Sequence, residues 1–328
     1  MATADQVKAL IRSHADGDDT KFYSVALQVA ARAARGGQGR FAQDLRDLVD
    51  QLRKEEGRRT HAHRRPVPVA QPKGELSSLL TVSYSTTKMA DLVLEPEVRD
   101  RLERVVLEQR QNDRLQAQGF RPLRRLLLIG PPGTGKTLSA SALAGELRLP
   151  LFLIRLDGLI TKFMGETAAK LRLVFDALAE TRGLYLFDEV DALGGERARS
   201  NDVGEIRRVL NSFLQFLEQE PSDSILVAAT NHPQLLDEAV FRRFDSVIQY
   251  PLPTPELARA VIRSRLATVK LGRISWPRID DAAAGLSHAE VTLSAEQAAK
   301  DAILAGKERV ETDTLVAALR ERHPRSAS

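Results

Sequence analysis

Eight consecutive residues have the types and spacing that phosphate chemistry requires. Residues 130–137 read GPPGTGKT, a glycine followed by four further residues and then by glycine, lysine and threonine. Glycines let backbone N–H groups approach phosphate oxygens, Lys136 offers a positive charge to the β- and γ-phosphates, and Thr137 offers a hydroxyl to Mg²⁺. We therefore predict a binding site for ATP and Mg²⁺ that uses Gly130, Pro131, Pro132, Gly133, Thr134, Gly135, Lys136, Thr137 and Leu138.

Two carboxylates follow an apolar run further along the chain. The sequence LFDEVD places Asp188 and Glu189 at the end of that run. Open α/β sheets bind ligands at the carboxyl ends of their strands, so both side chains are expected beside the phosphate site. Asp188 is a predicted Mg²⁺ ligand together with Thr137, and Glu189 can polarise a water for in-line attack on the γ-phosphate. The Asp-Glu order favours hydrolysis over a kinase or a switch.

A third polar group, Asn231, follows the apolar run ILVAAT at residues 225–230. Its amide is expected at the same edge of the sheet, where it can orient the attacking water. The alternative interpretation is a structural asparagine in a turn before Pro233. We include Asn231 with Lys136 and Glu189 among the predicted catalytic residues.

Five short apolar runs are expected to position these groups. Helix-patterned segments separate the first four runs, and buried strands that alternate with helices predict a parallel sheet with crossover helices. The predicted fold class is therefore α/β, with a five-stranded parallel sheet flanked by helices. Its strands are expected at residues 125–130, 151–155, 184–188, 225–230 and 246–250.

Hydrophobic periodicity and composition divide the 328 residues into four segments. Residues 1–56 show amphipathic helical stretches and are predicted to form a helical N-terminal domain that recognises a substrate or partner. Residues 57–75 are basic and rich in proline, which predicts a linker. The α/β domain is expected over residues 76–253 and an all-α domain over residues 254–328.

The overall composition excludes several classes of function. The chain has no cysteine, which excludes disulfides, thiolate chemistry and Cys-based zinc sites. Hydrophobic residues make up 43% and charged residues 28%, as in an ordinary globular protein. No apolar run is long enough to span a bilayer, and no signal peptide is recognisable. We therefore predict a cytoplasmic protein with no membrane partner.

Four motifs in a fixed order make residues 80–322 resemble the AAA+ ATPases. The motifs are GPPGTGKT, LFDEVD, AATN and LDEAVFRRFD. Within this superfamily the chain is most similar to the classical AAA family, which includes katanin and spastin, and it looks like a stand-alone bacterial-type member with a short helical N-terminal domain. The resemblance implies a P-loop NTPase fold, a C-terminal all-α lid, and a homo-oligomeric ring, usually a hexamer, with ATP between neighbouring subunits.

The resemblance also implies roles for residues outside the phosphate motif. In AVFRRFDSV, Arg242 and Arg243 match the family's arginine fingers, which reach the neighbour's ATP; either one can be the dominant finger. In GLSHAEV, His288 and Ala289 match the lid residues that touch the nucleotide, although His288 replaces a family glycine. Asp91 and Leu92 in MADLVL lie where the family contacts adenine through its backbone.

A loop after the second predicted strand matches the family's pore loop, with its pattern of aromatic, hydrophobic and glycine residues. The matching residues are Lys162, Phe163, Met164 and Gly165. The resemblance implies that Phe163 grips an extended polypeptide in the central channel. The alternative is that the Phe163 ring packs beneath its own loop.

These features predict an ATP-hydrolysing, ring-forming protein remodeller or unfoldase. Its expected partners are other copies of the chain, protein substrates, and a separate protease or adaptor recruited through residues 1–56. One alternative is a nucleic-acid-associated AAA+ motor or clamp-loader-like ATPase, which would share the phosphate motif and the arginines. Another is a nucleotide-gated scaffold, against which Glu189 and Asn231 argue.

Overall fold

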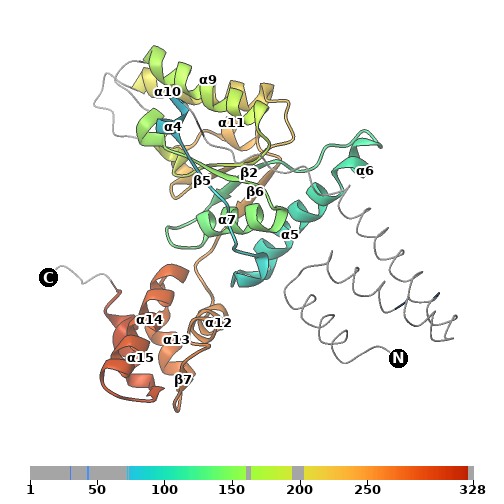
Figure 1. Cartoon of the computed structure of the whole chain (residues 1–328). Coiled ribbons are helices and arrows are strands. Elements are labelled where there is room, and N and C mark those ends of the chain that lie inside the picture. Colours follow the sequence, from blue (N-terminus) through green and yellow to red (C-terminus); the bar gives the residue numbers. More distant parts are fainter. Residues whose placement is uncertain are drawn as a thin grey trace. The chain divides into compact units, whose positions relative to one another are not determined.

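The computed structural model describes residue 72, residues 74–159, 164–193 and 203–323, together with Ala30 and Gln43 (Figure 1). The chain divides into two units, residues 1–68 and 69–328, and all of the described residues except Ala30 and Gln43 belong to the second. The predicted N-terminal domain at 1–56 and most of the linker at 57–75 therefore lie outside the described residues. The four domain boundaries stay predictions.

A six-stranded sheet forms the centre of the α/β region. Its strand order is β1-β3-β4-β5-β2-β6, and all neighbours are parallel except β1, which pairs antiparallel with β3. All five predicted strands are present and parallel, so the predicted fold class is confirmed, and β1 adds an edge strand. The strands are β1 (Leu80–Ser83), β2 (Arg125–Ile129), β3 (Leu151–Ile154), β4 (Leu184–Phe187), β5 (Ile225–Thr230) and β6 (Ser246–Gln249).

Helices alternate with these strands along the chain. The α-helices of this region are α4 (Leu76–Leu79), α5 (Pro96–Arg110), α6 (Asn112–Gln116), α7 (Lys136–Leu147), α8 (Leu156–Leu159), α9 (Met164–Glu180), α10 (Val203–Gln219) and α11 (Glu238–Phe241). The short 3-10 helices are η1 (Met89–Asp91), η2 (Val190–Leu193) and η3 (Pro233–Leu235).

The helices cover both faces of the sheet, because successive residues of each strand point to opposite faces. In β4, Leu184 and Leu186 join the core beneath α5 and α7, whereas Tyr185 and Phe187 join the core beneath α9 and α10. Figure 1 shows α9 and α10 on one side of the sheet and α5 and α7 on the other. A strand buried on both faces reads as a continuous apolar run, which explains the pattern LYLF.

A cluster of phenylalanine rings holds the end of β4 in place. The Phe187 ring contacts Phe213 of α10 at a centroid distance of 5.1 Å and Phe175 of α9 at 5.9 Å. Phe175 also contacts Phe213 at 5.9 Å. Phe187 is fully buried and directly precedes Asp188, so the ring cluster fixes the point at which the chain leaves the sheet.

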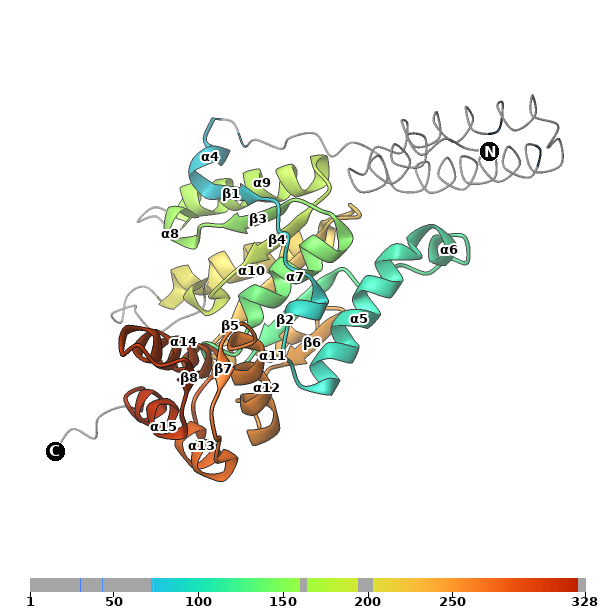
Figure 2. The same ribbon diagram turned by 60° about the horizontal axis from the view of Figure 1, so that its bottom comes forward.

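The C-terminal region is a small helical body (Figure 2). Helix α14 packs against α12 and α15, and α13 packs against α15. The region is not entirely helical, because two short parallel strands, β7 and β8, join its loops. Its elements are α12 (Pro255–Arg265), β7 (Lys270–Leu271), α13 (Trp276–Ala283), α14 (His288–Leu304), β8 (Arg309–Val310) and α15 (Thr312–Arg320). Across the described residues, no helix combines the length and apolar character needed to cross a membrane.

The ring cluster predicts a stability difference between two phenylalanines. Phe213→Ala should lower the free energy of unfolding by about 3–5 kcal/mol, because it leaves a cavity among packed rings. Phe120→Ala is the matched control: Phe120 is 65% exposed, so its removal should change stability by under about 0.5 kcal/mol. Urea unfolding followed by far-ultraviolet circular dichroism measures both. Equal losses for the two variants would contradict the cluster's role.

Candidate active site

The phosphate motif lies between the end of β2 and the start of α7, as predicted. Gly130 has a φ of +147°, and a Cβ atom there would lie 2.2 Å from the Tyr250 carbonyl oxygen. Gly133 has a φ of +74°, and a Cβ atom there would lie 2.6 Å from the Ser287 hydroxyl. A side chain at position 130 would collide with the Tyr250 backbone, and one at position 133 would collide with Ser287. Both positions therefore require glycine.

The Lys136 side chain bonds to the backbone of its own loop. Its ammonium group donates hydrogen bonds to the carbonyl oxygens of Gly130 and Pro131, both at 2.8 Å, and the residue is only 6% exposed. Burial lowers the pKa of Lys136, while the nearby carboxylates of Asp188 and Asp191 act in the opposite direction. A buried cation held between two carbonyls can exchange those neutral acceptors for a charged phosphate oxygen.

The start of α7 offers backbone donors to the same space. The Ser139 N–H bonds the Gly135 carbonyl at 2.8 Å, so the repeating bonds of the helix begin there. The N–H groups of Lys136, Thr137 and Leu138 therefore have no acceptor within the helix. These donors and the positive end of the helix dipole favour an anion at this position.

Thr137 and Asp188 meet at the edge of the sheet, as predicted for a Mg²⁺ site. The Thr137 hydroxyl donates to an Asp188 carboxylate oxygen at 2.6 Å. A hydroxyl and a carboxylate both offer hard oxygen atoms, which are the ligands that Mg²⁺ prefers. Nucleotide sites usually hold Mg²⁺ with one or two protein groups, and the phosphates of the substrate supply further ligands. The pair therefore fits the predicted cation.

Glu189 has an unusual backbone conformation. Its φ is +55°, and within the described residues Arg148 is the one other non-glycine with a positive φ. The Glu189 N–H bonds the Asp188 carboxylate at 3.0 Å, which helps to hold the turn, and the Glu189 side chain is exposed. A left-handed conformation is uncommon for glutamate, and such outliers cluster at functional sites.

Strand register places three predicted groups at one edge. Ile129 pairs with Thr230, so β2 and β5 end at the same level, and Phe187 pairs with Ala228, so β4 ends two residues earlier at the same edge. Gly130, Asp188 and Asn231 each follow one of these strands within two residues. The turn at Asn231 is held because the Thr230 hydroxyl bonds the Asp191 carboxylate at 2.7 Å and accepts from the His232 N–H at 3.0 Å. Asn231 itself is half-buried.

The two arginines lie at the opposite edge of the sheet. They precede β6, which runs parallel to β2, and the Asp245 N–H bonds the Arg125 carbonyl at the start of β2. The phosphate motif follows the other end of β2. The five residues of β2 span about 15 Å at about 3.3 Å per residue. Arg242 and Arg243 are therefore not brought together with the phosphate motif of their own chain.

The arginines also differ from each other. The Arg242 side chain is 77% exposed, and its nearest carboxylate is that of Glu238, itself 91% exposed, at 3.8 Å. Arg243 is held within its own subunit: its Nε lies 2.6 Å from a Glu218 carboxylate oxygen, and its Nη1 donates to the Ala239 carbonyl at 3.2 Å. Arg242 is thus exposed and only loosely paired, whereas Arg243 ties its segment to α10.

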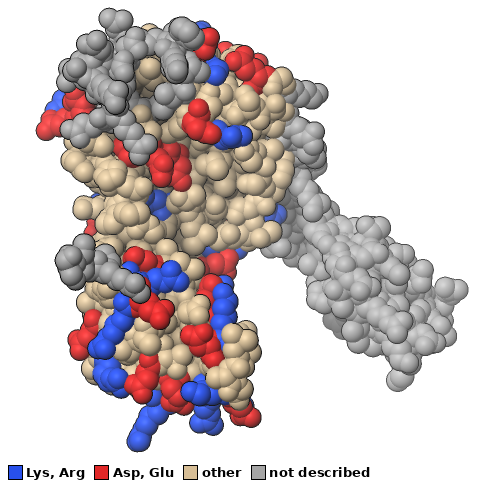
Figure 3. Space-filling model, turned by 90° about the vertical axis from the view of Figure 1, so that its left-hand side faces the viewer, with Lys and Arg blue, Asp and Glu red and all other residues tan. Residues whose placement is uncertain are grey.

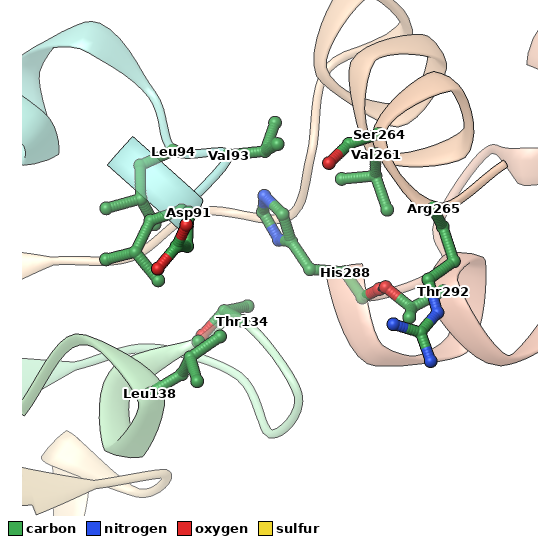
Figure 4. Close-up of a pocket in the computed structure, with 12 residues that line it drawn as sticks. Asp91, Val93, Leu94, Thr134, Leu138, Val261, Ser264, Arg265, His288 and Thr292 are labelled. Carbon is green, nitrogen blue, oxygen red and sulfur yellow. The ribbon is translucent and has the colours of Figure 1, made fainter. Parts of the chain in front are cut away.

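A cavity of about 250 Å³ lies beside the phosphate motif, between the α/β region and the helical region (Figure 4). The predicted residues Asp91, Leu92 and His288 line it together with Thr134, Gly135 and Leu138 of the phosphate motif. Sequence reasoning missed the other lining residues, which come from the segment after η1 and from α12 and α14. They are Val93, Leu94, Val261, Ser264, Arg265 and Thr292.

The start of α14 contacts the phosphate motif directly. The Ala289 N–H donates to the Gly133 carbonyl at 2.9 Å. Ser287 and Glu290 form a capping box: the Ser287 backbone N–H donates to the Glu290 carboxylate at 2.7 Å, and the Glu290 N–H donates to the Ser287 hydroxyl at 3.3 Å. The predicted lid residues His288 and Ala289 therefore adjoin both the phosphate motif and the cavity. Of the predicted pore loop, Lys162 and Phe163 lie outside the described residues, and Met164 and Gly165 begin α9.

Three comparisons with known proteins agree with this arrangement. The family model described as "ATPase family associated with various cellular activities (AAA)" matches residues 126–252. An uncharacterized AAA family ATPase, y4kL of Sinorhizobium fredii, is 30% identical over 327 residues, which is 100% of this chain and 97% of that protein. The crystal structure of the FIGL-1 AAA domain matches with a TM-score of 0.60 and 25% identity, over 76% of this chain and 87% of that one.

A further relative is the ATP-dependent zinc metalloprotease FtsH of Sulfurovum, which is 31% identical over 255 residues. The match includes 75% of this chain but only 38% of FtsH, so the chain spans well under half of that relative. The similarity to y4kL extends over the whole chain, and the family model covers the strands and loops that carry the phosphate site. This chain is therefore an ATPase of the AAA family.

Proposed function

We propose that this chain is a ring-forming AAA+ protein remodeller that binds ATP with Mg²⁺ between neighbouring subunits and uses hydrolysis to pull on polypeptide. The observation that carries the proposal is the separation of the hydrolytic groups. Asp188, Glu189 and Asn231 follow strands that end beside the phosphate motif, while Arg242 lies a strand length away at the other edge. A complete hydrolytic site needs the groups at both edges of the sheet. Two copies of the chain can supply them, one edge from each copy.

Within one subunit, the motif residues would bind and orient the nucleotide. The N–H groups at the start of α7 and the Lys136 ammonium would receive the phosphates, with Lys136 releasing its two carbonyl acceptors. Thr137 and Asp188 would hold Mg²⁺, which supplies charge neutralisation between the β- and γ-phosphates. Binding would therefore replace the Thr137–Asp188 hydrogen bond by contacts to the cation.

Glu189 would act on the attacking water. Its carboxylate can accept a proton from a water aligned with the γ-phosphate, and the Asn231 amide can fix the position of that water. Asp188 is bonded to Thr137, whereas the Glu189 side chain is exposed, so the two adjacent carboxylates can serve different partners. Asp191, held by Thr230, sets the loop that carries this arrangement.

The neighbour would supply the remaining charge. Arg242 is exposed at the far edge of the sheet, and no close ion pair within the described part of its own chain commits it. A guanidinium that reaches the γ-phosphate of the next subunit stabilises charge in the transition state. Arg243 would instead position that segment through its contacts with Glu218 and Ala239.

Polypeptide is the substrate class that the comparisons favour. FtsH is named as an ATP-dependent zinc metalloprotease, and 38% of it matches 75% of this chain. The pore-loop pattern at Lys162–Gly165 suits an unspecific grip on an extended chain, because an aromatic ring offers a large contact area. We propose that residues 1–56 recruit the substrate, an adaptor or a separate protease, and that the protein acts in the cytoplasm.

A nucleic-acid motor is the alternative function, and charge distribution argues against it. On the face shown in Figure 3, acidic and basic side chains alternate over the helical region instead of forming a patch of one sign. Within the helical region, Arg278 and Asp313 form an ion pair at 2.8 Å, and Lys270 and Glu308 lie 4.0 Å apart. Binding to a phosphate backbone favours clustered Lys and Arg.

Glu189→Gln tests the hydrolytic base. The variant should bind ATP normally but hydrolyse it at least about a hundredfold more slowly, because the amide cannot take a proton from water. Lys136→Ala should lose nucleotide binding itself. Phosphate release measures the first effect, and calorimetric titration with ATP measures the second. Unchanged turnover in Glu189→Gln would remove Glu189 from this role.

Arg242 and Arg243 can be separated by mixing subunits. Arg242→Ala alone should lose turnover by about 10³-fold or more. Mixing it with Glu189→Gln subunits should restore part of the activity, because some interfaces then combine an intact base with an intact Arg242. Arg243→Ala should chiefly lower thermal stability, since it breaks the Glu218 contact. Full activity of Arg242→Ala in a strictly monomeric protein would contradict action between subunits.

Phe163 tests the mechanical step. Phe163→Ala should keep basal ATP turnover, because the residue has no proposed contact with nucleotide, but it should abolish unfolding of a fluorescent tagged substrate protein. Phe163→Tyr should keep much of the unfolding, since it preserves the aromatic contact area. A thermal melt is the control: a buried phenylalanine would cost about 3–5 kcal/mol on truncation. A sharply lowered melting temperature would assign Phe163 to the interior instead.

A further inference from the structure

His288 has two ring nitrogens without partners. Both Nδ1 and Nε2 are shielded from solvent, and neither has a hydrogen-bond partner among the described residues. A buried polar atom without a partner typically costs about 1–3 kcal/mol. A protein can tolerate this loss of stability where a bound ligand supplies the missing hydrogen bond.

The His288 ring extends into the cavity from the start of α14, toward the segment that contains Asp91 and Val93 (Figure 4). Burial lowers the pKa of His288, so the imidazole is neutral near neutral pH. A neutral imidazole has one donor and one acceptor nitrogen. The cavity therefore contains an uncommitted hydrogen-bonding pair.

Three other polar side chains of the cavity already have partners, whereas the Ser264 side chain lies at its exposed rim. The Asp91 carboxylate accepts from the Lys88 N–H at 2.7 Å, and the Thr292 hydroxyl donates to the His288 carbonyl at 2.7 Å. Arg265 forms an ion pair with Glu296. The remaining walls include Leu92, Val93, Leu94, Leu138 and Val261. The cavity therefore combines apolar walls with a buried imidazole that has no partner among the described residues, a combination that suits a flat aromatic base.

A structural role for His288 is the competing explanation. The N-terminus of α14 is already capped by Ser287 and Glu290, so its donors do not need the imidazole. The lid contact to Gly133 uses the backbone of Ala289. Neither function requires a histidine at this position, and neither accounts for two unpaired nitrogens.

We propose that the His288 imidazole accepts a hydrogen bond from the amino group of the adenine base and so selects ATP over purine nucleotides that lack that group. Adenine carries an amino donor at the position where guanine carries a carbonyl acceptor. An accepting ring nitrogen can bond the adenine amino group. Opposite guanine, the same nitrogen would meet the lone pairs of a carbonyl oxygen and would be repelled. The inference rests on the proposed function, because it takes the cavity as the base subsite of the phosphate motif.

The test compares two nucleotides on the full-length chain by calorimetric titration. One is the β,γ-imido form of ATP, which resists hydrolysis, and the other is the same compound with purine in place of adenine, which lacks the amino group. The wild-type protein should bind the adenine form about three- to tenfold more tightly, the effect of one hydrogen bond. His288→Phe keeps a ring of similar shape but has no nitrogen, so it should bind both equally.

Two further variants complete the comparison. His323→Phe makes the same change at another histidine of the helical region, whose ring bonds the Ala282 carbonyl, and it should behave as wild type. His288→Gln restores an acceptor and should regain part of the discrimination.

Different results would contradict the role of His288 and the ATPase site itself. Full discrimination in His288→Phe would overturn the inference alone. The proposed function and the inference would both be overturned if the wild-type protein bound neither nucleotide. They would also both be overturned if Lys136→Ala bound the nucleotides as tightly as the wild-type protein does.

Discussion

The parallel pairing of β2, β5 and β4 is the constraint on which the rest of this structure depends. Because these strands run in the same direction and their last residues lie within two residues of one another in register, Gly130, Asn231 and Asp188 leave the sheet at one edge. Burial of both sheet faces beneath α5, α7, α9 and α10 makes that register costly to change, since a shift of one residue would exchange the two faces of each strand. The phosphate motif and its carboxylates are therefore held by the core and not by loops alone.

The same geometry separates the groups that a complete hydrolytic site requires. Parallel strands have one edge at which all of them end and one at which all of them begin, and Arg242 precedes β6 at the second edge. No bending of a short loop moves it across the length of a buried strand. The proposed interface between copies would relieve this restriction, because it would bring the beginning edge of one sheet beside the ending edge of another. The exposure of Arg242 and the anchoring of Arg243 fit that division of roles.

The helical region completes the nucleotide site by contacts that are few and local. One hydrogen bond joins Ala289 to Gly133, and the Ser287 hydroxyl lies where any side chain at position 133 would be. The cavity beside this contact is lined from both regions, so a bound base would touch both. A base bound there would contact His288 on one side and residues 91–94 on the other.

The sequence by itself determined the five parallel strands and the phosphate motif, because continuous apolar runs and a glycine-rich turn depend on local patterns. It predicted Thr137 and Asp188 as ligands of one Mg²⁺, because the phosphate motif and the carboxylate after a parallel strand are expected at the same edge of the sheet. It did not determine β1, the short β7–β8 pair, or the lining residues Val261, Ser264 and Arg265. Edge strands and cavity walls arise where distant segments pack, and no local period records that. The difference between Arg242 and Arg243, and the two unpaired nitrogens of His288, were likewise decided by tertiary structure. Each depends on which partners lie within hydrogen-bonding distance, and those partners come from other elements of the fold.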